Sequence, residues 1–280
     1  MSATTALDLL RASPLDPVDA RVLLAHALGW TRTQLITRAD EPLDAAAVER
    51  YLALEARRTA GEPVAQLVGM REFFGRPFDV TPSVLIPRPE TELLVEAALD
   101  AIDGIPHPAV LDLGTGSGAI AVSIAAERPD ARVWALDRSG EALAVARRNA
   151  DKLLDAHRPG GPLHWLQSDW YAALDPALAF DAIVSNPPYI AQHDPHLSQG
   201  DLRFEPRGAL TDDADGLTAI RAIVAGAGAR LKPGGTLWIE HGYDQAEAVR
   251  ALLAAHGFVA VESLVDLAAI ERTTGGRRPG

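Results

Sequence analysis

Residues 109–119 read AVLDLGTGSGA, an apolar run that passes directly into a segment with three glycines. Ala109–Leu113 has the length and composition of a buried strand, and Ala119–Glu127 continues as an apolar helix. The glycines between them allow positive φ angles and leave room for a ligand to touch the backbone. This order of strand, glycine turn and helix predicts a parallel α/β sheet that binds a ligand beyond the carboxyl end of its first strand.

The chain after this unit keeps alternating between strand and helix. Further strands are predicted at Arg132–Leu136, Leu163–Gln167, Phe180–Ser185 and Thr236–His241, and helices at Glu141–Leu154, Leu217–Leu231 and Gln245–His256. Alternation of this kind predicts a doubly wound, Rossmann-like α/β sheet with helices on both faces. Phe258–Leu264 and a stretch near Ala268–Arg272 are expected to be the final strands, and Gly275–Gly280 a frayed tail.

The part of the chain before residue 86 has a different pattern. Asp16 and Pro17 begin a helix that Gly29 ends, and Asp44 caps a second helix. Residues 62–85 are rich in glycine, proline and phenylalanine, as in a connector with short strands. We therefore expect a helical domain at residues 1–61, a connector with a β-hairpin at residues 62–85 and the α/β domain at residues 86–280.

The composition limits the kind of protein that this can be. The 280-residue chain has no cysteine, which excludes disulfides, thiolate zinc sites and cysteine nucleophiles. Its formal net charge of −12 counts against the broad basic surface of a duplex-binding protein. No apolar run approaches the ~20 residues that span a bilayer, and no signal peptide is recognisable. A cytoplasmic protein without membrane contact is expected.

Asp137 closes the second predicted strand, next to the glycine turn. A carboxylate at this position can accept hydrogen bonds from both hydroxyls of a ribose, so the pair predicts a nucleoside site. The spacing Gly114-x-Gly116-x-x-Ala119 also satisfies the dinucleotide fingerprint, which leaves NAD open as a ligand. Asp112, inside the strand, is explained by local hydrogen bonding and can be purely structural.

Residues 185–190 read SNPPYI and follow directly on the strand predicted at Phe180–Ser185. Two prolines cannot continue a central strand, because each lacks a backbone N–H and fixes φ. Asn186 offers a side-chain carbonyl, and Pro187 a backbone carbonyl that the next proline holds in place. Two fixed acceptors suit the two hydrogens of an incoming NH2 group, and Tyr189 can stack on a flat amide or base.

This arrangement favours a particular reaction. Planar amides and exocyclic amines are poor nucleophiles, because their nitrogen lone pair is delocalised. Acceptors that grip the N–H bonds favour the geometry in which the lone pair is freed, and the proton can leave after the nitrogen is alkylated. Together with the nucleoside site, this indicates methyl transfer from S-adenosylmethionine to a planar nitrogen. A rigid turn with a packing tyrosine, an NAD-binding oxidoreductase and a non-catalytic binding protein are the alternatives.

The chain as a whole resembles the release-factor glutamine methyltransferases, the HemK/PrmC group. The matching segments are LIPRPETE at 85–92, DLGTGSGAIA at 112–121, SDW at 168–170, SNPPYI at 185–190, RFEP at 203–206, DGL at 215–217 and EHG at 240–242. The first segment is the most specific, because nucleic-acid methyltransferases share the Asn-Pro-Pro-Tyr element but generally not this string. The resemblance implies a class I S-adenosylmethionine-dependent methyltransferase domain behind a small helical domain. Its implied substrate is the glutamine of the Gly-Gly-Gln motif in peptide chain release factors.

The resemblance also implies roles for individual residues. The cofactor would be held by Gly114, Thr115, Gly116, Ser117, Gly118, Asp137, Trp170 and Asn186, with Trp170 on the adenine side. The substrate glutamine would be held by Asn186, Pro187, Pro188 and Tyr189, of which Asn186, Pro187 and Tyr189 are the catalytic candidates. Arg88 and Glu90 would order the mouth of the site, and the helical domain would help to dock the release factor.

Other features carry less weight. The segment Asp213–Gly216 lacks two of the carboxylates that a calcium loop needs, and His193 and His196 lie in a polar loop without further clustered donors, so no metal site is expected. Glu240 is predicted to be a buried carboxylate with a structural or a catalytic role. The main rival hypothesis is a methyltransferase that acts on an exocyclic amine of a nucleic-acid base, although direct nucleic-acid binding is not expected.

Overall fold

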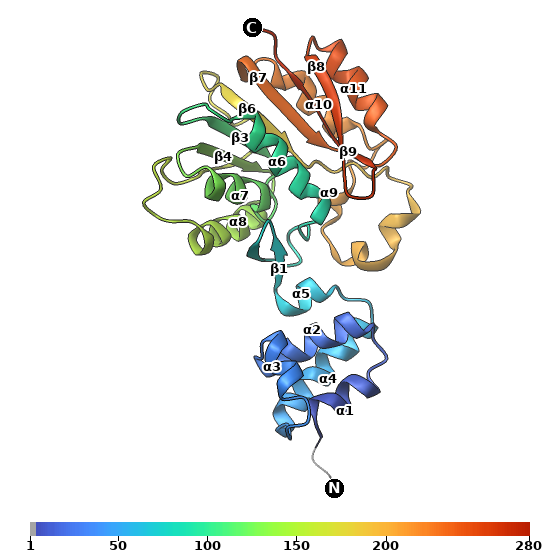
Figure 1. Ribbon diagram of the computed structural model, residues 1–280. Helices are drawn as coiled ribbons and strands as arrows, with labels where there is room; N and C mark the ends of the chain where they lie inside the picture. The colour runs from blue at the N-terminus through green and yellow to red at the C-terminus, as the bar shows by residue number, and fades with distance from the viewer. Residues whose placement is uncertain (1–3) are drawn as a thin grey trace. The chain divides into compact units, whose positions relative to one another are not determined.

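The computed structural model describes residues 4–280, which form two compact units (Figure 1). One unit consists of residues 4–70 together with Ser198–Phe204, and the other of Arg71–Leu197 and Glu205–Gly280. The boundary between Met70 and Arg71 lies inside the connector predicted at residues 62–85. We call these units the helical unit and the sheet unit.

The helical unit is built from short helices around a small apolar core. Its elements are α1 (Ala6–Ala12), α2 (Pro17–Leu28), α3 (Arg32–Thr37), α4 (Ala45–Thr59), α5 (Val64–Val68) and the 3-10 turn η3 (Gly200–Phe204). As predicted, Asp16 caps α2 by accepting the N–H of Val18 at 2.8 Å, and Asp44 caps α4 by accepting the N–H of Ala47 at 2.7 Å. Side chains of Leu23, Leu24 and Tyr51 fill the core.

The segment Ser198–Phe204 is far in sequence from the rest of the helical unit. Arg58, on α4, holds it by donating from Nη1 to Asp201 at 2.9 Å, while its Nε donates to Asp19 at 2.7 Å. Gln66 donates to the backbone carbonyl of Phe204 at 3.0 Å. The sequence analysis did not predict this association.

The sheet unit contains a seven-stranded sheet in the order β5-β4-β3-β6-β7-β9-β8. The strands are β3 (Ala109–Leu113), β4 (Arg132–Asp137), β5 (His164–Gln167), β6 (Phe180–Ser185), β7 (Leu231–Glu240), β8 (Val259–Val265) and β9 (Glu271–Arg277). β3 pairs in parallel with β4 and β6, and β4–β5 and β6–β7 are also parallel pairs, whereas β9 runs antiparallel to both neighbours. The predicted doubly wound α/β fold is confirmed, with one antiparallel strand added.

Helices cover both faces of this sheet (Figure 1). One face carries α6 (Glu92–Ala101), α7 (Ala119–Glu127) and α8 (Gly140–Leu153), whose apolar side chains share one buried cluster with the strands. The other face carries α10 (Thr218–Ala227) and α11 (Ala246–Ala255), which belong to a second cluster. Between the two packed faces, β3 is buried at every residue and β6 at all but one, whereas the edge strand β5 is exposed or partly exposed along its length.

The remaining elements of the sheet unit are short. They are the two-stranded sheet of β1 (Met70–Phe73) and β2 (Arg76–Asp79), the 3-10 turns η1 (Pro89–Thr91) and η2 (Pro195–Ser198), and α9 (Arg207–Leu210). Phe74 and Gly75 join β1 to β2 with φ angles of 50° and 71°, the positive values that a tight two-residue hairpin turn requires. None of the helices in residues 4–280 has the length and apolar character needed to cross a membrane.

The prediction of a frayed tail at Gly275–Gly280 is wrong. Gly275 and Gly276 are residues of β9 and pair with Trp238 and Leu237 of β7. A Cβ added to Gly275 would lie 2.2 Å from the ring of Trp238, so glycine is required because the indole packs flat against the backbone there. Glycines that the sequence analysis interpreted as a loose end are instead a packing requirement in the middle of the sheet.

Candidate active site

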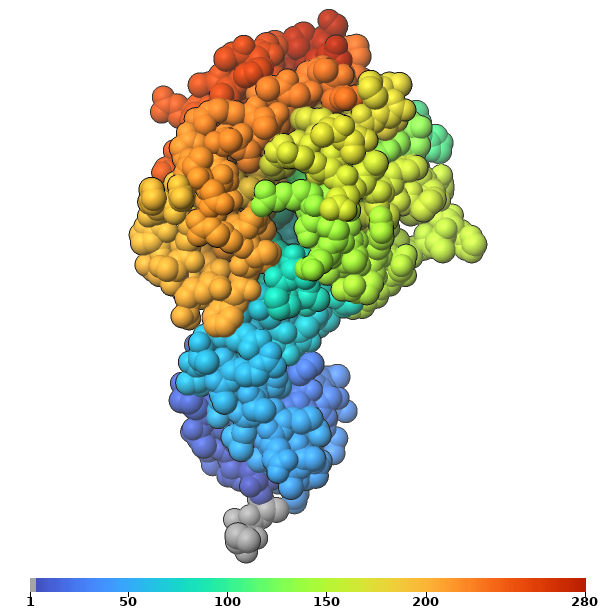
Figure 2. Space-filling model, turned by 180° about the vertical axis from the view of Figure 1, so that it is seen from behind, coloured from blue at the N-terminus to red at the C-terminus, as the bar shows by residue number. Residues whose placement is uncertain are grey.

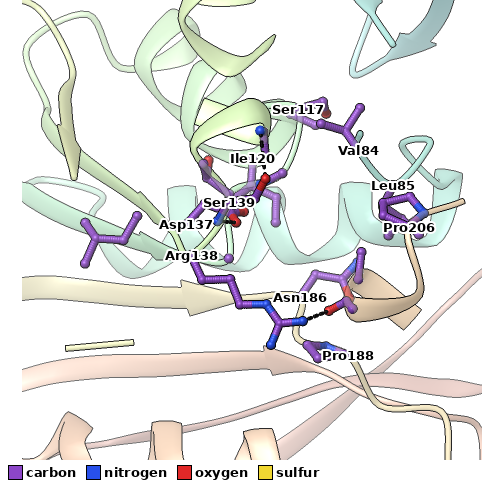
Figure 3. A pocket seen from close by; sticks show the side chains of 18 of the residues that line it. Val84, Leu85, Ser117, Ile120, Asp137, Arg138, Ser139, Asn186, Pro188 and Pro206 are labelled. Atoms are coloured by element: carbon purple, nitrogen blue, oxygen red, sulfur yellow. Dashed lines mark hydrogen bonds between the residues drawn. The ribbon is translucent and has the colours of Figure 1, made fainter. Parts of the chain in front are cut away.

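A cavity of about 320 Å³ opens at the carboxyl ends of β3, β4 and β6. Figure 2 shows the hollow in the sheet unit, bordered by teal, green and orange segments. Its lining includes Val84, Leu85, Arg88, Thr91, Gly114, Thr115, Gly116, Ser117, Asp137, Arg138, Ser139, Ser168, Asp169, Trp170, Asn186, Pro188, Pro206 and Gly208. In the close-up of Figure 3, Asp137 and Ser139 lie opposite Leu85 and Pro206, and Asn186 and Pro188 form a third side.

The glycine turn gives the cavity a backbone wall. Gly114, Gly116 and Gly118 have φ angles of 74°, 56° and 82°, in the left-handed region that residues with a Cβ rarely adopt. A Cβ on Gly116 would meet no atom within 4 Å, so open space faces the backbone here. A Cβ on Gly118 would instead touch Ala146 at 3.0 Å, so this glycine serves the packing of α7 against α8. Of the three glycines, Gly118 does not line the cavity.

Asp137 joins the end of β4 to the glycine turn. Its Oδ2 accepts the N–H of Gly116 at 2.9 Å, and its Oδ1 accepts the N–H of Ser139 at 2.8 Å. Each carboxylate oxygen can accept a second hydrogen bond, so the group still has capacity for two hydroxyl donors from a ligand. The carboxylate lies where the nucleoside site was predicted, at the cavity wall.

Trp170 is positioned by the loop after β5. Its φ angle of 45° is unusual for a bulky residue, and the hydroxyl of Ser168 fixes the turn by donating to the carbonyl of Trp170 at 2.8 Å. The ring lines the cavity close to Gly114. An aromatic surface is thereby presented beside the glycine turn.

Asn186 and Pro188 line the cavity from the end of β6. The side-chain amide nitrogen of Asn186 donates to the hydroxyl of Thr91, which also lines the cavity, at 3.1 Å, and Oδ1 keeps its capacity to accept from a ligand. Ser185 fixes the preceding strand end by donating its hydroxyl to the carbonyl of Leu113 at 2.7 Å. The acceptor that the sequence analysis assigned to Asn186 is therefore at the same cavity as the glycine turn.

Two members of the Asn-Pro-Pro-Tyr element do not line the cavity. Pro187 is buried, and the ring of Tyr189 packs against the apolar cluster of α10 and α11. The Tyr189 hydroxyl donates to Oε1 of Glu240 at 3.3 Å, and its carbonyl accepts from the side chain of Gln245 at 3.0 Å. Tyr189 is thus held at both ends, behind the cavity wall rather than in it.

Comparison with known proteins decides the family. Residues 4–69 match the PrmC N-terminal domain, and residues 89–201 match the methyltransferase small domain. The release factor glutamine methyltransferase of Burkholderia pseudomallei is 77% identical over 279 residues, which cover 100% of this chain and 98% of the relative. The protein of the same name from Bordetella pertussis is 54% identical over 98% of this chain and 99% of its own length. The chain belongs to the release factor glutamine methyltransferase family.

Membership in this family confirms several predictions at once. The chain is a class I methyltransferase with S-adenosylmethionine as its cofactor, and a nucleic-acid base as the methylated group is not favoured. Among solved structures, a 16S rRNA N2 G1207 methyltransferase from T. thermophilus, in complex with AdoMet and guanosine, matches with a TM-score of 0.53 and 22% identity. The match covers 75% of this chain and 49% of that chain, and it shows the fold alone.

The methyltransferase cavity depends on residues that the sequence analysis did not identify. Asn149, buried on α8, donates to the carbonyl of Ser117 at 2.8 Å and to that of Asp79 at 3.0 Å, so it ties the glycine turn to β2. Its spacing with Ala142 and Ala146 on the apolar side of the helix was a signal that could have identified it. Arg138 lines the cavity and donates to the carbonyl of Gly208 at 3.1 Å (Figure 3).

The LIPRPETE segment is anchored by a partner far away in sequence. The guanidinium of Arg88 pairs with Oε1 of Glu205, and Oε2 of Glu205 accepts the N–H of Ile86 at 2.8 Å. The carboxyl of Glu205 is buried, so this ion pair holds residues 86–88 at the edge of the cavity. Glu90 is exposed and does not line the cavity.

Two further carboxyl groups are fully buried near the strand ends. Burial raises the pKa of Asp112 to about 7, against hydrogen bonds that its Oδ2 accepts from the Thr115 hydroxyl at 2.6 Å and the Ala121 N–H at 3.2 Å. These contacts match the structural role considered for Asp112, because they tie the glycine turn and the start of α7 to β3. Burial likewise raises the pKa of Glu240 to about 7.

Proposed function

We propose that this protein transfers a methyl group from S-adenosylmethionine to the side-chain amide nitrogen of the glutamine in the Gly-Gly-Gln motif of peptide chain release factors. The observation that carries the proposal is the single cavity shared by the glycine turn, Asp137 and the amide of Asn186. A nucleoside site and an acceptor for an NH2 group are thus adjacent. The relatives named above are release factor glutamine methyltransferases, which supports the same substrate.

The residues present fit the cofactor. The cavity of about 320 Å³ falls within the size range of small-molecule sites, and Gly116 leaves open space against the backbone. Asp137 would accept the ribose hydroxyls, Trp170 would flank the adenine, and residues 114–117 would hold the methionine part. When bound, S-adenosylmethionine supplies an electrophilic methyl group. The residues named above would bind and orient the cofactor in the cavity that Asn186 also lines.

The chain's own contribution to the reaction is orientation of the glutamine amide. Oδ1 of Asn186 would accept one N–H bond of the substrate at the cavity, which holds the nitrogen and favours the geometry with a free lone pair. Pro187, to which the sequence analysis assigned the second acceptor, does not line the cavity. No base is required before the attack, since the proton becomes acidic once the nitrogen carries the methyl group. Tyr189 would act from behind the wall, by fixing the Asn-Pro-Pro-Tyr backbone.

The helical unit is the proposed docking surface for the release factor. Residues 4–69 match the PrmC N-terminal domain, and none of them is among the residues that line the cavity. The exposed aliphatic side chains Val18, Ile36 and Leu52, at 64%, 72% and 47%, are the kind of surface that a protein partner covers. A protein that modifies a translation factor would act in the cytoplasm.

One experiment tests the substrate directly. The purified protein is incubated with radiolabelled S-adenosylmethionine and either a release factor, the same factor with Gln replaced by Glu in Gly-Gly-Gln, or total nucleic acid. We expect label in the unaltered factor and none in the Gln-to-Glu factor. Label in nucleic acid with an unlabelled release factor would overturn the proposal.

A further inference from the structure

Gln245 joins three loops behind the Asn-Pro-Pro-Tyr element, and the proposed reaction does not yet use it. Its Oε1 accepts the N–H of Gly242, in the loop after β7, at 2.8 Å. Its Nε2 donates to the carbonyl of Tyr189 at 3.0 Å and to that of Gly216 at 3.3 Å. A primary amide has two N–H donors and one carbonyl acceptor. All three groups have a partner here, so the partners fix which end of the amide faces Tyr189.

The side chain makes these bonds at a position where helices commonly use it in another way. Gln245 is the N-cap residue of α11, and short polar residues are preferred at N-caps because they accept an N–H of the first turn. The side chain of Gln245 makes no such capping bond. It extends to the neighbouring loops instead, so its removal leaves the first turn of α11 with the same hydrogen bonds.

The peptide group between Tyr189 and Ile190 is held at both of its polar atoms. The carbonyl of Tyr189 accepts from the amide described above, and the N–H of Ile190 donates to the carbonyl of Leu210 at 3.0 Å. Leu210 is the last residue of α9, and other residues of this helix line the cavity. A Cβ on Gly216, which has a φ angle of 80°, would collide with the Tyr189 carbonyl. The peptide is therefore closely packed and fixed relative to one wall of the cavity.

A stiff stretch of backbone connects this peptide to Asn186. Two prolines lie between Asn186 and Tyr189, each with φ fixed near about −65°, and the second of them lines the cavity. Neither proline has an N–H with which to anchor the stretch. The strand end before it is fixed by Ser185, whose hydroxyl donates to the carbonyl of Leu113 at 2.7 Å. Gln245 supplies the corresponding side-chain anchor after it.

We infer that Gln245 is a positioning residue for the methyl-transfer reaction. It fixes the peptide after Tyr189 and, through the two prolines, keeps the Asn186 carbonyl at the place where the substrate amide is held. The inference rests on the proposed function, because the position of Asn186 matters only if a glutamine amide binds there. Gln245 does not line the cavity, so it acts through the backbone and not on the substrate itself.

The test uses two variants of Gln245 that differ in what they leave behind. Gln245→Ala removes all three hydrogen bonds. Gln245→Glu keeps the length of the side chain and an acceptor for the N–H of Gly242, but turns a carboxylate oxygen toward the carbonyls of Tyr189 and Gly216. An ionised carboxylate cannot donate, so both variants release the same two carbonyls.

The matched control is Arg250→Met, on the same helix. Nη1 of Arg250 donates to Ser263 on β8 at 2.6 Å and to Glu271 on β9 at 2.7 Å, so the variant loosens α11 from these strands. None of these three residues lines the cavity. For each protein, kcat and KM for the release factor, the Tm, and the Kd and stoichiometry of S-adenosylhomocysteine binding are measured. The kcat is expressed per cofactor-binding site, so that unfolded protein does not contribute.

We expect kcat per site to fall about 10- to 100-fold in both Gln245 variants, the scale of a positioned group displaced by up to about 1 Å. KM for the release factor and Kd for S-adenosylhomocysteine should stay within about threefold of wild type, because neither the helical unit nor the glycine turn is altered. Arg250→Met should lower Tm but keep kcat per site within about twofold of wild type.

Two results would overturn the inference. One is a Gln245→Ala variant with wild-type kcat per site. The other is an Arg250→Met variant that loses as much kcat as Gln245→Ala at a comparable loss of Tm, which indicates that only the stability of α11 matters. A wild-type protein that binds the cofactor but does not methylate the release factor would instead refute the proposed function, so the two failures are distinguishable. Should Gln245→Ala not fold, the same criteria apply to Gln245→Glu.

Discussion

Replacement of Asp137 by alanine should weaken cofactor binding by an amount that its contacts allow us to calculate. The carboxylate has capacity for two further donors beyond the N–H groups of Gly116 and Ser139, and we assign this capacity to the ribose hydroxyls. Hydrogen bonds to a charged group contribute about 1.5–3 kcal/mol when one partner is lost. The Kd for S-adenosylhomocysteine, measured by titration calorimetry, should therefore rise about 10- to 150-fold in Asp137→Ala.

Loss of the Gly116 contact can also loosen the glycine turn, so the ribose contribution needs a separate measurement. An analogue of S-adenosylhomocysteine without the ribose 2′-hydroxyl should bind the wild type more weakly, and Asp137→Ala should reduce its affinity less than it reduces that of S-adenosylhomocysteine, because only the 3′-hydroxyl bond remains to be lost. The matched control is Glu141→Gln, which removes an exposed charge in the first turn of α8 without lining the cavity. Affinity of Asp137→Ala within about threefold of wild type would refute the assignment of the ribose site.

Further predictions concern catalysis, docking and stability. Asn186→Ala should lower kcat by ~10²–10³ while the Kd for the cofactor stays unchanged. Asn186→Asp should keep more activity, because a carboxylate still accepts hydrogen bonds from the substrate amide. Normal methylation by Asn186→Ala would contradict this prediction. Tyr189→Phe should be milder than Tyr189→Ala, since it loses one hydrogen bond but keeps the packed ring, and equal kcat values would count against the packing role. Deletion of residues 1–69 should raise KM for the intact release factor far more than Kd for the cofactor, and an unchanged KM would remove the docking role. Asp112→Asn should reduce the fall of Tm between about pH 4 and pH 7. The folded state holds a proton on Asp112 up to a pKa of about 7 that the unfolded state releases near 3.8, so this group lowers wild-type stability with rising pH by up to about 1.4 kcal/mol per unit, and the part due to Glu240 remains in the variant. The same slope in the variant would exclude Asp112 as its source.

The parts of the site that were predictable from the sequence are those encoded in short segments. The glycine turn, Asp137 and the Asn-Pro-Pro-Tyr element each combine a strand end with residues of special backbone or hydrogen-bonding capacity, and parallel topology brings strand ends to one edge. The spacing of a few residues therefore sufficed to place Asn186 and Gly116 at one cavity.

The contacts that hold these segments were not predictable in the same way. Arg88 and Glu205 are 117 positions apart, and Arg58 and Asp201 are 143 apart, so no local pattern links them. Gly275 was misjudged for a related reason, because the cause of the glycine is the ring of Trp238 on a neighbouring strand. Packing between residues far apart in sequence determines the structure at these positions. At the chain end, the local sequence predicted a frayed tail where the structure has a strand.

The same contacts explain why the site residues should be probed by paired measurements. Asp137 holds two backbone N–H groups in addition to its proposed ligand. Tyr189 packs in the apolar cluster under α10 and α11, and its hydroxyl donates to Glu240. When a side chain both packs in the fold and contributes to the site, its removal changes stability and function together. Thr91 is different, because valine reproduces its shape and only the hydroxyl is lost. A loss of turnover in Thr91→Val without a loss of Tm can therefore be assigned to the missing hydroxyl, which accepts from Asn186 and lies at the cavity.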